Sequence, residues 1–138
     1  MTMLNLLPSS PRLQLALSAA LIVAGDVVYN HCHMYVGDTT PDSRKEWVAA
    51  LDKLAALKPT AVVAGHKDPT RGDPPGSIGD SRRYIEAYGQ LYDAGQRGRE
   101  LFEAMVSRYP DWVSRQQFLL LGLAHRRADV SADRTAVR

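Results

Sequence analysis

Two short segments of the sequence end in a residue that can bind a metal ion. Residues 22–26 (IVAGD) and 62–66 (VVAGH) each pass from apolar side chains through a glycine, and they end at Asp26 and His66. Divalent transition metals, zinc in particular, accept both a carboxylate and an imidazole as ligands. Zinc normally takes three or four protein ligands. The pair therefore predicts part of a metal site and requires further donors.

The surrounding elements indicate how these two polar residues would meet. Residues 21–24 and 61–64 are apolar runs of the length that is typical of buried strands. Between them, the sequence predicts a helix that starts after Thr40 and ends before Pro59. A strand, a helix and a second strand form a βαβ unit, in which the strands are parallel and their carboxyl ends share one edge of the sheet. We therefore expect the carboxylate and the imidazole to lie close together.

An H-x-H pair follows Asp26, with His31 and His33 on either side of Cys32. If residues 31–36 form a strand, both imidazoles point to the same face and can supplement the metal ligands. The alternative is that these histidines line a pocket or are partly exposed without binding metal. Cys32 is expected to be a small buried apolar residue, because no base is recognisable that would make it a nucleophile.

No residue is assigned a catalytic role from the sequence. Tyr29, Tyr35 and Arg71 are candidates to line a substrate cleft. Arg71 belongs to residues 67–79 (KDPTRGDPPGSIG), whose three prolines and three glycines predict an irregular loop. A mobile surface segment is the alternative for this loop.

The second half of the chain is predicted to be helical. Asp80 or Ser81 can cap a helix, and further helices are expected around residues 101–105 and 114–121. Tyrosines at i, i+4 spacing on the first of these helices are expected to pack in the core: Tyr84, Tyr88 and Tyr92.

The composition predicts one folded, soluble, cytoplasmic domain. The 138 residues are 45% hydrophobic and 23% charged. A net charge of +2 gives no reason to expect a nucleic-acid partner, and the single cysteine excludes an intrachain disulfide framework. The apolar stretch at residues 13–24 is shorter than the roughly 18–20 residues of a membrane span. Its weak flanking signals favour an internal segment over a secretory signal peptide.

One family resemblance covers residues 21–68. The C-terminal half of metallo-β-lactamase superfamily hydrolases is similar to this chain in three segments: residues 25–30 (GDVVYN), 47–54 (WVAALDKL) and 62–66 (VVAGH). The resemblance implies that Asp26 bridges two metal ions and that His66 binds one of them. It also implies hydrolysis of an ester, a lactone or a related bond by a metal-activated hydroxide.

The chain departs from the family in one informative way. The H-x-H-x-D-H motif of the family's first half is absent, and so is the further histidine ligand that precedes its Gly-Asp strand. The resemblance therefore implies an α/β fold that is half of a four-layer αββα sandwich. We expect residues 1–79 to form this half, residues 80–123 to be a helical extension and residues 124–138 to be a flexible tail.

The missing half has consequences for partners and function. A half-sandwich exposes an apolar sheet face, so we expect a homodimer or a complementary half-domain to cover it; truncation of a longer product is a third explanation. The expected function is metal-dependent hydrolysis with zinc or another divalent metal, impaired if no partner supplies the missing ligands. The alternatives are a non-catalytic dimerisation or interaction module, and a small-ligand-binding α/β domain that uses Asp26 as a strand-end acid.

Overall fold

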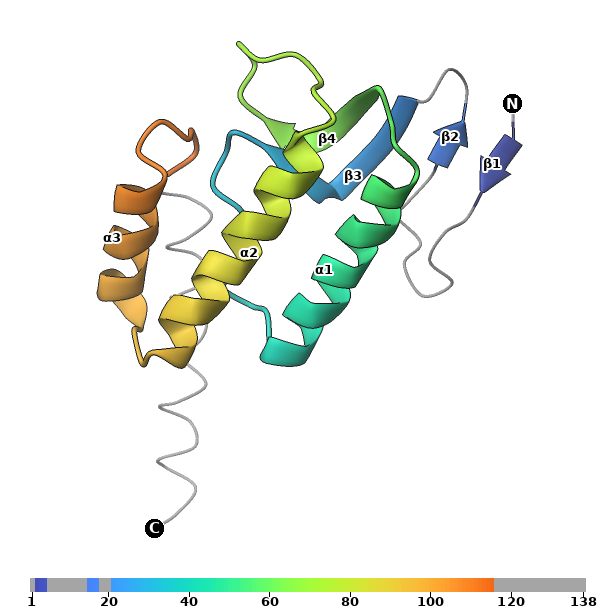
Figure 1. Ribbon diagram of the computed structural model, residues 1–138. Coiled ribbons are helices and arrows are strands. Elements are labelled where there is room, and N and C mark those ends of the chain that lie inside the picture. The colour runs from blue at the N-terminus through green and yellow to red at the C-terminus, as the bar shows by residue number, and fades with distance from the viewer. Residues whose placement is uncertain (1, 5–14, 18–20, 116–138) are drawn as a thin grey trace.

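A computed structural model describes residues 2–4, 15–17 and 21–115, and it has the mixed α/β architecture that the sequence predicts. Its strands form two separate pairs, one antiparallel and one parallel. In chain order the elements are β1 (Thr2–Leu4), β2 (Leu15–Leu17), β3 (Leu21–Asn30), α1 (Pro41–Ala56), β4 (Ala61–Lys67), α2 (Ser77–Asp93) and α3 (Gly98–Arg108) (Figure 1).

The central unit is the predicted βαβ crossover. β3 and β4 pair in parallel, and α1 connects them. The start of α1 is fixed by a reciprocal cap, in which Ser43 N donates to Thr40 Oγ1 (3.1 Å) and Thr40 N donates to Ser43 Oγ (2.8 Å). Pro41 occupies the first helical position, where its missing N–H costs nothing. The predicted beginning of this helix is confirmed.

β3 is longer than the strand predicted at residues 21–24. It continues to Asn30 through a bulge with two register shifts, in which the pairs Val23↔Val63, Gly25↔Ala64 and Tyr29↔His66 follow one another. Six residue steps along β3 therefore face three residue steps along β4. Gly25 has a φ of +55°, a left-handed conformation that glycine adopts without steric cost. A bulge of this kind bends a strand and redirects its side chains.

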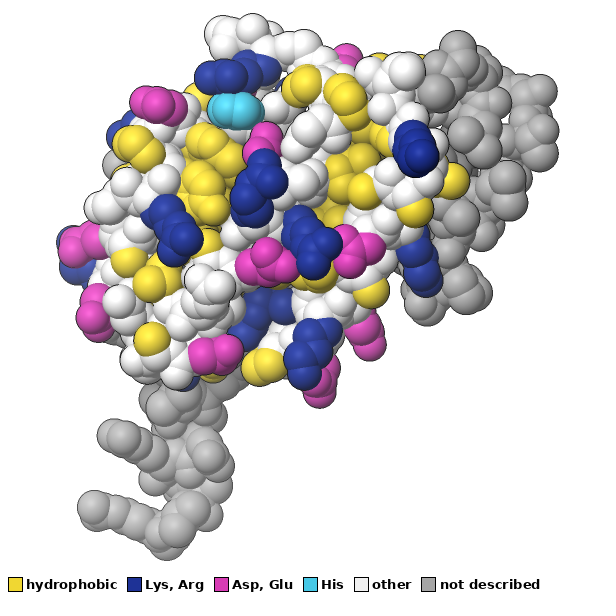
Figure 2. All heavy atoms as spheres, viewed as in Figure 1, with side chains coloured by type: hydrophobic (Ala, Val, Ile, Leu, Met, Phe, Trp, Pro, Cys, Tyr) yellow, Lys and Arg dark blue, Asp and Glu magenta, His cyan; other side chains and the backbone are white. Residues whose placement is uncertain are grey.

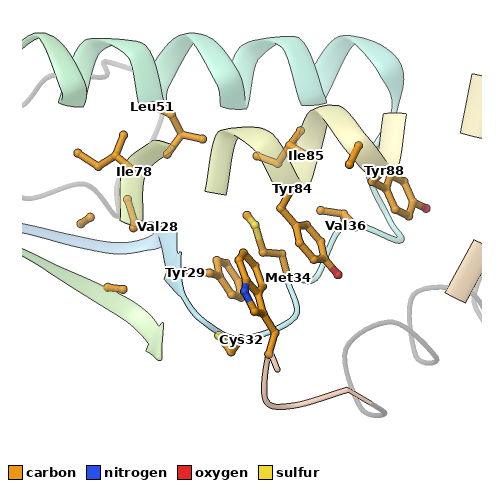
Figure 3. Packing of buried hydrophobic residues seen from close by; sticks show 14 of the residues in the cluster. Val28, Tyr29, Cys32, Met34, Val36, Leu51, Ile78, Tyr84, Ile85 and Tyr88 are labelled. Atoms are coloured by element: carbon orange, nitrogen blue, oxygen red, sulfur yellow. The ribbon is translucent and has the colours of Figure 1, made fainter. Parts of the chain in front are cut away.

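The helices α1 and α2 pack on one face of the β3–β4 pair, and the main core lies between them (Figures 1 and 3). The predicted burial of Tyr84 and Tyr88 is confirmed, whereas Tyr92 is only partly buried. The largest fully buried side chains come from β3, from the segment that follows it and from the three helices: Ile22, Met34, Leu51, Leu54, Tyr84, Ile85, Tyr88, Leu101 and Met105.

Charged side chains cover the helical face (Figure 2), and the exposed Val23 lies on the opposite face of the sheet. Figure 2 shows Lys, Arg, Asp and Glu side chains intermixed over the helical face. There Arg82 of α2 forms ion pairs with Asp52 of α1 and with Glu86. On the sheet, Val23 lies between the buried residues Ile22 and Ala24, so its side chain points away from the helices, and it is 43% exposed.

Two further predictions are wrong. The irregular loop does not extend to residue 79, because α2 begins at Ser77. The N–H of Ser77 donates to Pro74 O (3.2 Å), so the proline turn leads directly into the helix, and Ile78 is buried. Residues 31–36 are not a strand: His31 has a φ of +51°, and the pairing here is an isolated bridge between Cys32 and Val113.

The last expected elements fall largely outside the described residues. α3 confirms the helix expected around residues 101–105, but most of the helix expected at residues 114–121 and all of the tail at 124–138 lie outside. None of the helices described here is both long enough and apolar enough to cross a membrane.

Candidate functional site

Asp26 and His66 are brought together as the βαβ unit predicts. Asp26 Oδ1 lies 3.3 Å from His66 Nε2, and both side chains are accessible to solvent, at 58% and 37% of their surface respectively. The position of Asp26 on its strand differs from the prediction. Asp26 does not follow the end of β3 but sits inside it, on the bulge between Val23 and Tyr29. The bulge directs the carboxylate toward the imidazole on β4.

The backbones of β3 and β4 approach each other closely just before Asp26 and His66, and this brings the two side chains into contact. A Cβ atom on Gly65 would lie 2.5 Å from the carbonyl carbon of Gly25, 2.6 Å from its oxygen and 2.8 Å from Asp26 N. Only a residue without a side chain therefore fits at position 65. The glycine before each polar residue thus has a separate task, since Gly25 provides the left-handed turn and Gly65 provides the space.

The bulge is held from the helical side by two hydrogen-bonding side chains. Trp47 of α1 donates from Nε1 to Val27 O at 2.8 Å. Ser81 of α2 accepts from Tyr29 N (3.0 Å) and donates to Tyr29 O (2.9 Å) through the same hydroxyl. These bonds give backbone groups of Val27 and Tyr29 side-chain partners within the irregular part of the ladder. Both helices therefore fix the segment that carries Asp26.

Tyr29 is buried directly beneath the pair. Its ring stacks on the His66 ring, with centroids 4.8 Å apart and planes inclined by 21°. Only 4% of Tyr29 is exposed, and this burial raises the pKa of its phenol to about 12. The prediction placed Tyr29 in a substrate cleft; the structure places it behind His66.

His33 lies in an aromatic cluster. Its ring is fully buried, Nδ1 is 3.0 Å from the hydroxyl of Tyr84, and its edge faces Trp112. Nε2 is buried without a hydrogen-bond partner among the described residues. Burial and, to a smaller extent, the charge of Arg115 lower the pKa of His33 to about 4.

His31 and Cys32, the other two residues of the H-x-H segment, lie next to the same aromatic cluster. His31 Nδ1 lies 3.3 Å from Asn30 Oδ1, and the His31 ring contacts that of Trp112. Cys32 is 2% exposed, as predicted, and burial raises the pKa of its thiol to about 11. Across residues 2–4, 15–17 and 21–115, no three His, Cys, Asp or Glu side chains cluster closely enough to hold a metal ion. The H-x-H pair therefore does not join Asp26 and His66.

The remaining cleft candidates lie in irregular segments, where Tyr35 is partly buried and Arg71 is exposed. Tyr35 donates its hydroxyl to Asp38 Oδ2, and this bond raises the pKa of the phenol. Arg71 is exposed in the loop that follows β4. Asn30, which the sequence did not single out, ties this loop to β3: its Nδ2 donates to Gly72 O (2.8 Å), and its backbone carbonyl accepts from Asp68 N (2.9 Å).

A groove of about 480 Å³ lies between the start of α1 and the end of α2. Its walls include Arg44, Val48, Gly89 and Asp93, and neither member of the Asp26–His66 pair lines it. The groove and the pair are therefore separate features.

Comparison of the chain with protein-family models, with curated proteins and with solved structures finds no match in any of the three. Chemical roles for Asp26 and His66 consequently rest on their geometry and on the sequence resemblance given above.

Proposed function

We propose that Asp26 and His66 supply two ligands of a divalent transition-metal centre in a hydrolase that acts on an ester, a lactone or a related bond. The observation that carries this proposal is the 3.3 Å separation of Oδ1 and Nε2, with both side chains accessible to solvent. His66 is the next-to-last residue of β4, and ligands of open α/β sheets commonly bind at the carboxyl ends of the strands.

The separation suits a shared metal ion. Two donor atoms that each lie about 2.0–2.1 Å from a tetrahedral zinc ion are about 3.4 Å apart. A charge-assisted hydrogen bond between the same groups is shorter, about 2.7–2.9 Å. The accessible surfaces of both side chains leave a path by which an ion can reach them.

The pair can supply two of the protein ligands of such a centre, but a complete centre needs more. One or two further protein ligands are needed, and we propose that a second copy of the chain, or a complementary half-domain, provides them. When bound, the metal would lower the pKa of a water molecule and so generate a hydroxide nucleophile. Asp26 would contribute negative charge to the cation, and His66 would contribute a neutral nitrogen donor.

Calorimetric zinc titration of the full chain tests this assignment. We expect binding that is weakened or lost in Asp26→Asn, which removes the carboxylate charge, and in His66→Gln, which removes the imidazole nitrogen donor. Asp42→Asn is the matched control, since Asp42 is an exposed carboxylate on the first turn of α1. Equal zinc binding by all four proteins would refute the proposal.

The reaction class needs a separate measurement. We expect hydrolysis of a p-nitrophenyl ester or a simple lactone that stops on chelation and returns with zinc. Hydrolysis that resists chelators, or that survives in both Asp26→Asn and His66→Gln, would contradict a metal-dependent mechanism.

The second candidate is a non-catalytic interaction module, which the exposure of Val23 on the sheet favours. A second copy would cover this face in a homodimer. Light scattering should then give twice the chain mass of 15.2 kDa. Val23→Lys should restore the monomer mass, whereas Leu57→Lys, at an exposed leucine that follows α1, should not. A dimer that binds no zinc would favour the module over the hydrolase.

A further inference from the structure

The contacts of Tyr29 link the exposed pair to the helical layer. The backbone of Tyr29 is fixed by Ser81, whose hydroxyl bonds both its N–H and its carbonyl. The ring also packs at a tilt against Trp47, with centroids 6.2 Å apart. Tyr29 is thus a rigid part of the fold that lies in direct contact with a half-exposed side chain.

The stacking of Tyr29 on His66 restricts the rotation of the imidazole ring. An exposed imidazole can turn about its side-chain bonds, and each orientation presents a different ring nitrogen. A near-parallel stack at 4.8 Å on one face of the His66 ring favours this ring plane over others. In this orientation Nε2 is the nitrogen that faces Asp26.

We infer that Tyr29 is a positioning residue, whose stacked ring holds His66 with Nε2 directed at Asp26. The part of this inference that concerns metal affinity rests on the function proposed above. The part that concerns the orientation of the imidazole stands on the contacts alone. Outer residues that orient a metal ligand typically change metal affinity by about 10–100-fold when they are replaced.

Three substitutions in the full chain separate positioning from general stability. Tyr29→Leu removes the stacking ring, and Tyr29→Phe keeps it. Tyr88→Leu is the matched control, because Tyr88 is equally buried in the same core but stacks on Tyr92 instead. Ser81→Ala is a milder variant that removes both hydroxyl bonds to Tyr29, and it is used if Tyr29→Leu does not fold.

Zinc titration is the first measurement. We expect Tyr29→Leu to bind zinc about 10-fold more weakly than the wild-type chain. Tyr29→Phe and Tyr88→Leu should keep the wild-type affinity, and Ser81→Ala should lose affinity in the same direction as Tyr29→Leu. Unchanged affinity in a folded Tyr29→Leu protein, or an equal loss in Tyr88→Leu, would overturn the inference.

Proton NMR of the His66 ring in the metal-free chain is the second measurement, and it does not depend on the proposed function. The stacked tyrosine should shift the His66 ring protons upfield in the wild-type chain and in Tyr29→Phe, and Tyr29→Leu should lose this shift. If the wild-type chain binds no zinc, the proposed metal centre fails and this spectrum still decides the positioning. Ring shifts that are the same with and without the aromatic ring at position 29 would refute it.

Discussion

His66 and His33 occupy opposite kinds of environment in the same small fold. His66 is 37% exposed, has a carboxylate 3.3 Å from Nε2, and contacts the core through one face of its ring. His33 has no exposed surface and is surrounded by the rings of Tyr84 and Trp112. The first can meet a ligand from solvent, whereas the second is part of the packing that joins residues 31–33 to the chain around Val113.

The contrast teaches that a conspicuous motif and an accessible site are different things. In the sequence, H-x-H has the more obvious spacing for a metal site, and Asp26 and His66 are 40 positions apart. In the fold, the distant pair converges and the adjacent pair is held among aromatic rings. Burial removes a histidine from metal chemistry unless other ligands are buried with it, because an ion would have to be desolvated there.

Replacing each histidine by alanine should give the largest difference in the free energy of unfolding. His33→Ala leaves a cavity beside Trp112 and removes one of the hydrogen-bond partners of the Tyr84 hydroxyl, so we expect a loss of about 3 kcal/mol in the free energy of unfolding. His66→Ala should cost less than about 1 kcal/mol, because the side chain is partly solvated. Urea denaturation followed by circular dichroism measures both, and equal losses would break the comparison.

A lower pH should destabilise the folded protein through the buried His33. The ordinary pKa of 6.5 applies to His33 in the unfolded chain, whereas burial lowers the pKa to about 4 in the folded protein. Between these values the unfolded state binds the extra proton, so the free energy of unfolding decreases as the pH falls from 6.5 toward 4. The full loss is up to about 3 kcal/mol.

Urea midpoints at several pH values across this window test the effect. His33→Gln should remove the part of the pH dependence that His33 causes, and His66→Gln should retain it. A pH dependence that is identical in the wild-type chain and in His33→Gln would show that His33 does not titrate as its burial requires.

A methyl group added at Gly65, where β3 and β4 approach most closely, tests the backbone that carries the exposed Asp26–His66 pair. Gly65→Ala would place Cβ against the Gly25 carbonyl, and we expect a loss of about 2 kcal/mol together with displacement of Asp26 from His66. Gly72→Ala is the matched control, because beyond the adjacent residues of the chain no atom lies within 4 Å of the position of its Cβ. Thermal unfolding of the two variants measures the cost, and equal stability would mean that the strands do not need this close approach.

Local patterns were sufficient to predict the βαβ unit. The apolar runs before Gly25 and Gly65 indicated two buried strands, and Thr40 with Pro41 indicated the helix start. Parallel strands then implied that Asp26 and His66 would meet, which the 3.3 Å contact confirms. Each of these inferences depended on neighbouring residues or on one general rule of topology.

The errors arose where distant residues determine the local structure. A glycine after a strand can end it or begin a bulge, and here Trp47 and Ser81 hold the bulge from elements 20 and 52 positions away. Residues 31–36 have β-forming side chains, yet the aromatic cluster and the bridge to Val113 draw them into an irregular path. No pattern within either segment indicates those partners.

The two tryptophans of the chain divide between the two regions compared above. Trp47 is bonded to the bulge that carries Asp26, and Trp112 stacks on Tyr84 beside His33. Each indole is therefore a built-in optical probe of one region. Chains that keep a single tryptophan would report, through emission wavelength and quenching, whether the exposed edge loosens before the aromatic cluster or together with it.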